Sequence, residues 1–154
     1  MKKSEVIKQI RKAYVEAIAF KNAVQKLHLG FDVESEVVQL SHTDSAFGKW
    51  LYQDGRYLSQ LESFQNLEEK HEKVHRIFKA IFKLNIEVVE KDGVNMLISN
   101  TNKLKNSKRR LIDAYCKDFL KANTKLMTAI RQLYNEVAIL PNSCFMDDKL
   151  LTST

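Results

Sequence analysis

The sequence contains little glycine or proline, with four Gly and one Pro in 154 residues. Hairpins and tight turns depend on these residues, so their scarcity argues against a fold of many short strands. The two cysteines, Cys116 and Cys144, are too few for a disulfide framework and are typical of a reducing compartment. No apolar run approaches the roughly 18 residues of a membrane span, and the charged start lacks the apolar segment of a signal peptide. We therefore expect a cytoplasmic protein built mainly from helices.

Apolar residues recur at three- and four-residue steps, which is the period of an amphipathic helix. The expected helices cover residues 4–29, 45–53, 57–91 and 94–140. Gly30, Gly93 and Pro141 each follow a long segment, where such residues commonly end a helix. Residues 31–43 lack the helical period and predict a loop. The expected fold is all-α, a four-helix bundle with one short helix after a long loop and a long C-terminal helix.

Finer expectations concern how these helices begin and which faces they bury. Thr43 or Asp44 can cap the short helix. The last helix would be about 68 Å long if unbroken, and its inward stripe is expected to begin at Leu111 and Tyr115. Weak helix formers at residues 100–107 leave a kink there open. An apolar stripe on so long a helix would extend beyond a compact bundle, which favours a homodimer.

Residues 71–75 read HEKVH, which contains the H-E-x-x-H pattern of zinc peptidases. His71 and His75 lie four apart on one helix, so both imidazoles can face one metal, with Glu72 beside them. A peptidase also needs a third ligand downstream, and the nearest acidic candidate, Glu87, lies about 18 Å further along the same helix. Four His are also too few for a di-iron enzyme of the hemerythrin type. We therefore expect no catalysis.

A dense basic run, at Lys103, Lys105, Lys108, Arg109 and Arg110, accompanies a net charge of +6. Such a patch can bind nucleic acid or an acidic protein. No aromatic residues are interleaved with these charges and no known nucleic-acid motif surrounds them, which favours a solvated helix face and argues against nucleic acid as a partner. A helical binding module that uses this face, residues 103–110, is the alternative function.

The segment SAFGKWLY places Gly48 and Trp50 three and five residues after Ser45, and HEKVH follows further along the chain. Together these motifs resemble the chemoreceptor zinc-binding domain, the CZB family of bacterial chemoreceptors and diguanylate cyclases. The resemblance implies a helical bundle that holds zinc through four ligands. These are a His on the first helix, the Cys of a C-x-x-G-x-W segment and both His of an H-x-x-x-H, here His71 and His75. It covers roughly residues 8–90.

Two of the four family ligands are absent from this sequence. Ser45 stands at the Cys position, and Ala17 stands at the position of the first His. A neutral hydroxyl is a poor zinc ligand and a methyl group is none. The resemblance therefore implies a degenerate zinc site, with weak zinc binding at most and no tightly bound cofactor. Ser45 also cannot act as a redox-sensing thiolate, and we expect Cys116 to be an inert core residue.

Three other residues are candidates to replace the missing ligands. His42 precedes Ser45 by three residues and could complete a three-His site with water. Glu16 adjoins Ala17 but is expected to point about 100° away around the helix, and His28, about three turns from Ala17, is too distant. The alternative is that the paired His are ordinary core residues satisfied by Ser45, Tyr or water.

The end of the chain resembles the opening of a GGDEF diguanylate cyclase domain. The matching residues are Leu140, Pro141, Asn142 and Phe145. The Asp, Thr and Arg of that pattern are replaced by Asn135, Ala138 and Ser143. We expect residues 1–140 to form the CZB-like domain and residues 141–154 a flexible tail, either a remnant of an output domain or the lead-in to one.

These observations predict a bacterial sensory or regulatory domain of the chemotaxis or cyclic-di-GMP type. The expected mechanism is a change in helix packing and dimerisation, transmitted along the last helix. The expected partners are a second copy of the chain and a signalling output domain or partner protein.

Overall fold

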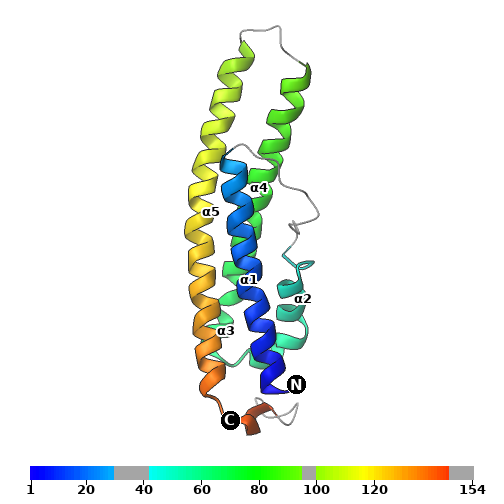
Figure 1. Cartoon of the computed structure of the whole chain (residues 1–154), viewed down its shortest axis with the longest axis vertical. Helices are drawn as coiled ribbons and strands as arrows, with labels where there is room; N and C mark the ends of the chain where they lie inside the picture. Colours follow the sequence, from blue (N-terminus) through cyan, green and yellow to red (C-terminus); the bar gives the residue numbers. More distant parts are fainter. Residues whose placement is uncertain (30–41, 95–99, 146–154) are drawn as a thin grey trace.

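The computed structural model describes residues 1–29, 42–94 and 100–145, and in residues 88–94 and 100–105 it describes only the backbone. Every regular element in these ranges is a helix. In chain order they are α1 (Lys3–His28), α2 (Ala46–Tyr52), the 3-10 helix η1 (Asp54–Leu58), α3 (Glu62–Gln65), α4 (Leu67–Val94), α5 (Asn100–Ile139) and the 3-10 helix η2 (Asn142–Phe145). The predicted all-α bundle, with one short helix and a long last helix, is confirmed (Figure 1).

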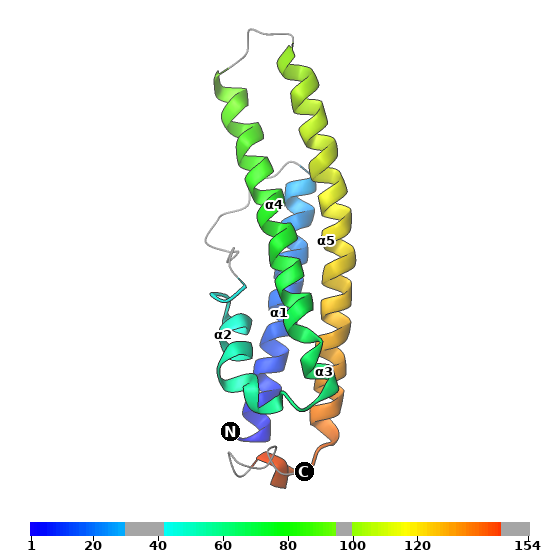
Figure 2. The same cartoon turned by 180° about the vertical axis from the view of Figure 1, so that it is seen from behind.

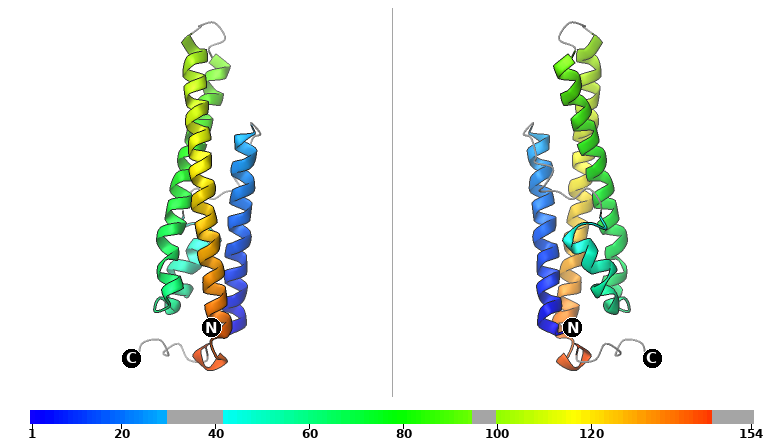
Figure 3. Two further views of the ribbon diagram at one scale, coloured as in Figure 1. Left: turned by 90° about the vertical axis from the view of Figure 1, so that its left-hand side faces the viewer. Right: turned by 90° about the vertical axis from the view of Figure 1, so that its right-hand side faces the viewer.

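The three long helices lie side by side, and α5 packs along both α1 and α4 (Figures 1 and 2). The short α2 packs against α1 on the side away from α5. Seen edge-on, α1 stops partway along the other two long helices (Figure 3). His28, the last residue of α1, lies 3.1 Å from Asp113 of α5, which marks the level at which this cover ends. We call residues 83–94 and 100–111, which lie beyond the end of α1, the hairpin region. The other described residues form the bundle region.

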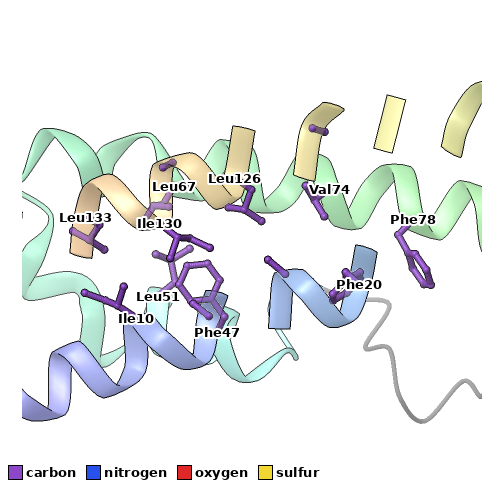
Figure 4. Close-up of a cluster of buried hydrophobic side chains, with 14 of the residues drawn as sticks. Ile10, Phe20, Phe47, Leu51, Leu67, Val74, Phe78, Leu126, Ile130 and Leu133 are labelled. Carbon is purple, nitrogen blue, oxygen red and sulfur yellow. The ribbon is translucent and has the colours of Figure 1, made fainter. Parts of the chain in front are cut away.

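The core of the bundle region is formed by one apolar face of each helix (Figure 4). Phe20, Phe78 and Phe119, from the three long helices, form a ring cluster with centroids 5.2 to 6.4 Å apart. Fully burying a side chain of this size contributes about 1.5–3 kcal/mol. Packing between helices therefore supplies the main stabilisation, as expected for amphipathic helices of ordinary propensity.

The start of α1 is bound to the end of α5. The Glu5 carboxylate accepts a hydrogen bond from the backbone N–H of Lys2 at 2.8 Å, which satisfies a donor at the start of α1. The Lys3 ammonium donates to the carbonyl oxygens of Ala138 and Leu140 at 2.7 and 2.6 Å. The last carbonyls of a helix lack intrahelical partners and carry partial negative charge, so this cation stabilises the end of α5.

The expected continuous helix from Tyr57 is wrong in its first turns. The chain instead forms η1 and α3, and α4 begins only at Leu67. Leu61 has extended backbone angles, which separate η1 from α3. Because Leu58 and Phe64 are buried within these short pieces, the apolar spacing looks continuous in the sequence although the backbone turns.

The inward stripe of α5 also differs from the prediction. Leu111 is 45% exposed, whereas Ile112 and Cys116 are buried. Adjacent helix faces have the same period, so spacing alone did not distinguish them. The helix itself is continuous over 40 residues, about 60 Å, with no break at residues 100–107.

The described part of the C-terminal segment packs on the bundle. Residues 142–145 form η2, and the side chain of Phe145 is buried. Gly30, most of the expected loop at 31–43 and residues 146–154 lie outside the described residues. Among the residues that are described, none of the helices combines the length and the apolar character needed to span a membrane.

Candidate functional site

The short helix α2 is fixed to the bundle by Ser45 and Gly48. The hydroxyl of Ser45 accepts a hydrogen bond from the N–H of Gly48 at 2.9 Å, so Ser45 is the N-cap, and the expectation of Thr43 or Asp44 is wrong. A side chain at position 48 would overlap the carbonyl oxygen of His42, so only glycine fits there. The residue at the family's cysteine position thus serves here as a helix cap.

Aromatic packing explains the rest of this segment. Phe47 and Trp50 are buried and stack at 6.0 Å between ring centroids. Trp50 also makes an edge contact with Phe64 at 6.3 Å, and Gly55 allows the backbone to pass close to the indole. The G-x-W spacing therefore holds α2 against α3, just before the start of α4.

His71 and His75 face the interior of the bundle, and each is only 2% exposed. Their ring centroids are 4.5 Å apart. Phe47 of α2 contacts the ring of His71 at 4.8 Å, and Phe20 of α1 contacts that of His75 at 4.6 Å. Both imidazoles thus lie where α1, α2 and α4 meet.

The environment of His71 keeps its ring neutral. Burial, reinforced by the neighbouring rings of His75 and His42, lowers the pKa of His71 from its ordinary 6.5 to about 3. Its Nε2 lies 3.4 Å from the hydroxyl of Ser45, while its Nδ1 is buried without a hydrogen-bond partner. A neutral imidazole with an available lone pair is the form that binds metals.

Glu16 also reaches this site, so the expectation that it points away is wrong. One oxygen of its carboxylate, Oε2, accepts a hydrogen bond from the N–H of Phe47 at 3.0 Å. Burial raises the pKa of Glu16, and hydrogen bonds from Phe47 and Ser45 oppose that rise. The offset of about 100° from Ala17 describes only the Cα–Cβ direction. Rotation about the other bonds of the glutamate side chain lets its carboxylate reach Phe47 of α2.

A small cavity of about 10 Å³ lies at the centre of these groups. Its polar lining consists of Glu16, His71, His75 and Asn123, the last contributed by α5. Asn123 is 1% exposed and donates from Nδ2 to the carbonyl of Ala17 at 2.9 Å, while its Oδ1 has no hydrogen-bond partner. Sequence reasoning missed Asn123, although a lone amide on an otherwise apolar helix face was a usable signal.

The donor atoms of Glu16, His71 and His75 all lie within 4.8 Å of one another. Tetrahedral zinc with bonds of about 2.0–2.2 Å holds its ligands about 3.4 Å apart. The widest donor separation exceeds that spacing by about 1.4 Å, and nitrogen and carboxylate oxygen are donors that zinc accepts. The residues present therefore fit a zinc ion.

The other candidate ligands are arranged differently. The His42 ring lies 6.2 and 6.4 Å from the rings of His71 and His75, so it borders the pair, but Glu16 is the third donor grouped with them. Ala17 contributes its backbone carbonyl to Asn123. His28 is remote and exposed, paired with Asp113.

Glu72, which would be the base of a peptidase, lies at the surface. Its carboxylate is 3.9 Å from the guanidinium of Arg76, and its side chain is 51% exposed. Glu87 pairs with Lys108 at 2.9 Å between α4 and α5. Neither of these two carboxylates is grouped with the His pair.

The cysteines and the basic run lie away from the cavity. Cys116 is buried, and burial together with Asp113 raises the pKa of its thiol to about 11. That shift disfavours the reactive thiolate. In the basic run, Lys108 is engaged with Glu87, whereas Arg109 and Arg110 are exposed.

The fold and the site define a helical domain with a buried, polar, metal-compatible centre. Comparison with known families agrees: residues 18–82 match the model of the chemoreceptor zinc-binding domain, CZB. The matched range includes α2 and both His, and it begins just after Glu16 and Ala17. The match supports the resemblance drawn from the motifs. No curated protein and no solved structure matches the chain significantly.

Proposed function

We propose that this chain is a CZB-type sensory or regulatory domain that acts in signal transduction, without catalysis of its own, through changes in helix packing. The observation that carries the proposal is the burial of His71 against α2 and of His75 against α1, within the range that matches the family. A bacterial chemoreceptor or diguanylate cyclase pathway is the setting that the resemblance suggests.

The site is suited to this role because all four principal helices meet at one level. Phe20 comes from α1, Phe47 from α2, His75 from α4 and Asn123 from α5. The hydrogen bond from Asn123 to the carbonyl of Ala17 ties α5 to α1 directly. A change at the cavity therefore acts on α5, which passes the full length of the molecule. Zinc held by His71 and His75 together with a donor from a neighbouring helix would cross-link α4 to that helix.

Dimerisation is part of the proposal and concerns the hairpin region. Ile86 on α4 is 40% exposed and Leu111 on α5 is 45% exposed, beyond the cover of α1. Exposed apolar side chains on paired helices favour packing against a second pair. Light scattering that gives the mass of one chain at micromolar concentration would contradict this part.

A fusion tests the signalling role. The full chain is joined to the catalytic domain of a diguanylate cyclase that is active only as a dimer, and the rate of cyclic-di-GMP synthesis is measured. Asn123→Ala removes the link between α5 and α1, and we expect a change in output of about threefold, which corresponds to about 0.65 kcal/mol of coupling.

The matched control for this fusion is Thr124→Ala. Thr124 is the next residue on α5, is exposed, and donates only to the carbonyl of Leu120 at 2.8 Å. It should leave the output unchanged. Equal output from both variants and the parent fusion would remove the support for a regulatory role of this site.

A further inference from the structure

We propose that Glu16 replaces the missing family ligands, so that Glu16, His71 and His75 bind one divalent transition-metal ion through two nitrogens and one carboxylate oxygen. This inference rests on the proposed function for the location of the site. The inference goes beyond the proposed function because it names a ligand that the family pattern does not contain. The ligand types in turn determine which class of ion the site selects.

The first support is the position of the Glu16 carboxylate. Its Oε2 is held at 3.0 Å by the N–H of Phe47, in the first turn of α2. That amide has no partner within its own helix, so the carboxylate serves as its acceptor. The hydrogen bond fixes a side chain that would otherwise be flexible and holds it beside the two rings, with all three donor atoms within 4.8 Å of one another.

The second support is independent of the donor cluster. Nδ1 of His71 and Oδ1 of Asn123 are buried and have no hydrogen-bond partner, and both residues are at least 98% buried. Both residues line the same cavity as Glu16. Buried polar atoms are nearly always satisfied in folded proteins, by protein, water or an ion. A cavity of about 10 Å³ has room for a single water molecule or metal ion.

The donor set determines what the site prefers. Thiolate favours soft ions, whereas imidazole and carboxylate accept zinc, cobalt, nickel and divalent iron. Ser45, which stands at the family's cysteine position, has its hydroxyl engaged with Gly48 and lies 3.4 Å from His71. Without a thiolate, thiol-specific oxidants cannot release the ion, so occupancy depends on the concentration of metal rather than on redox state.

The test measures metal affinity in the full chain, purified without a His tag and stripped with EDTA. Zinc and cobalt are titrated in competition with a chromophoric chelator. We expect one ion per chain, no stoichiometric binding in His71→Ala, and an affinity at least tenfold lower in Glu16→Gln. Glu16→Asp keeps the charge but shortens the reach, and it should weaken binding as well.

The matched control is Glu72→Gln. Glu72 follows His71 in the sequence, carries the same charge as Glu16 and is exposed, paired with Arg76. It should bind zinc with the affinity of the parent protein. Circular dichroism establishes that each variant remains helical.

The spectrum of the cobalt form tests the ligand types separately. Nitrogen and oxygen ligands give visible d–d bands without the near-ultraviolet sulfur-to-cobalt charge transfer that a thiolate produces. The parent protein should lack the charge-transfer band, and Ser45→Cys should acquire it. A charge-transfer band in the parent protein would overturn the assignment.

The outcomes separate this inference from the proposed function. Loss of binding in His71→Ala with unchanged affinity in Glu16→Gln would overturn the role of Glu16 and leave the family site standing. Absence of binding in the parent protein would also overturn the inference and indicate that the cavity holds only water. Neither result changes the cyclic-di-GMP readout on which the regulatory proposal depends.

Discussion

The bundle region and the hairpin region are built from the same two helices but differ in what covers them. In the bundle region, α1 packs along α5 and α2 packs against α1, and Phe78, Ile81 and Phe119 are fully buried. Of the described helices, only α4 and α5 continue into the hairpin region (Figure 3). Ile86 and Leu111 are exposed there. The amphipathic period does not change at the boundary. The same kind of residue thus stabilises the fold in one region and is available for association in the other.

The largest expected difference between the two regions is in the cost of removing an apolar side chain. Phe119→Ala removes a ring that contacts Phe20 and Phe78, and we expect a loss of about 3–5 kcal/mol in the free energy of unfolding. Urea unfolding followed by circular dichroism measures this loss. A loss below about 1 kcal/mol would mean that the ring cluster is not the centre of the core.

A smaller effect is expected from the titration of His71 in the bundle region. Its pKa is about 3 in the folded chain and 6.5 in the unfolded chain, so between these pH values the unfolded chain binds more protons. Stability should therefore fall as the pH falls below 6.5, by at most about 1.4 kcal/mol per pH unit. Above pH 6.5 this contribution is constant.

Urea unfolding at pH 7 and pH 5, with EDTA present, measures this slope. His71→Leu removes the titrating group and should flatten the dependence, because a leucine neither gains nor loses a proton. An identical pH dependence in the variant and the parent protein would assign the slope to other groups.

The smallest effect on stability is expected in the hairpin region, where Leu111→Lys should change the free energy of unfolding by about 0.5 kcal/mol or less. The same substitution places a charge on the apolar face that we propose for dimerisation. Light scattering should therefore give a dimer for the parent chain and a monomer for the variant. A variant that unfolds at much lower urea concentration would show that Leu111 belongs to the core instead.

The helices could be predicted because helical period is a local property. Residues 4–29 and 45–53 were predicted almost to the residue, as α1 and α2. The turns before α4 were not, because Leu58 and Phe64 are buried in short pieces whose backbone direction depends on the packing of α2. The spacing of apolar residues indicates which residues are buried, but it does not indicate where the backbone changes direction.

The site was predictable only where it follows a motif. His71 and His75 lie on one helix at a fixed offset, so their common orientation follows from helix geometry alone. Glu16 and Asn123 reach the cavity from α1 and α5, and their approach depends on how three helices cross. The helical offset of about 100° between positions 16 and 17 did not determine where the carboxylate lies, because the side chain can rotate. Long polar side chains therefore need the tertiary structure before they can be assigned to a site.

The hydrogen bonds of Lys3 to the end of α5 limit the kinds of motion that α5 can make. A single ammonium group holds the carbonyls of both Ala138 and Leu140. Rotating α5 about its own axis, or sliding it by one turn of about 5.4 Å, would break both hydrogen bonds together. Bending of α5 further along its length leaves them intact. The contacts of Lys3 thus favour bending of α5 over rotation or sliding.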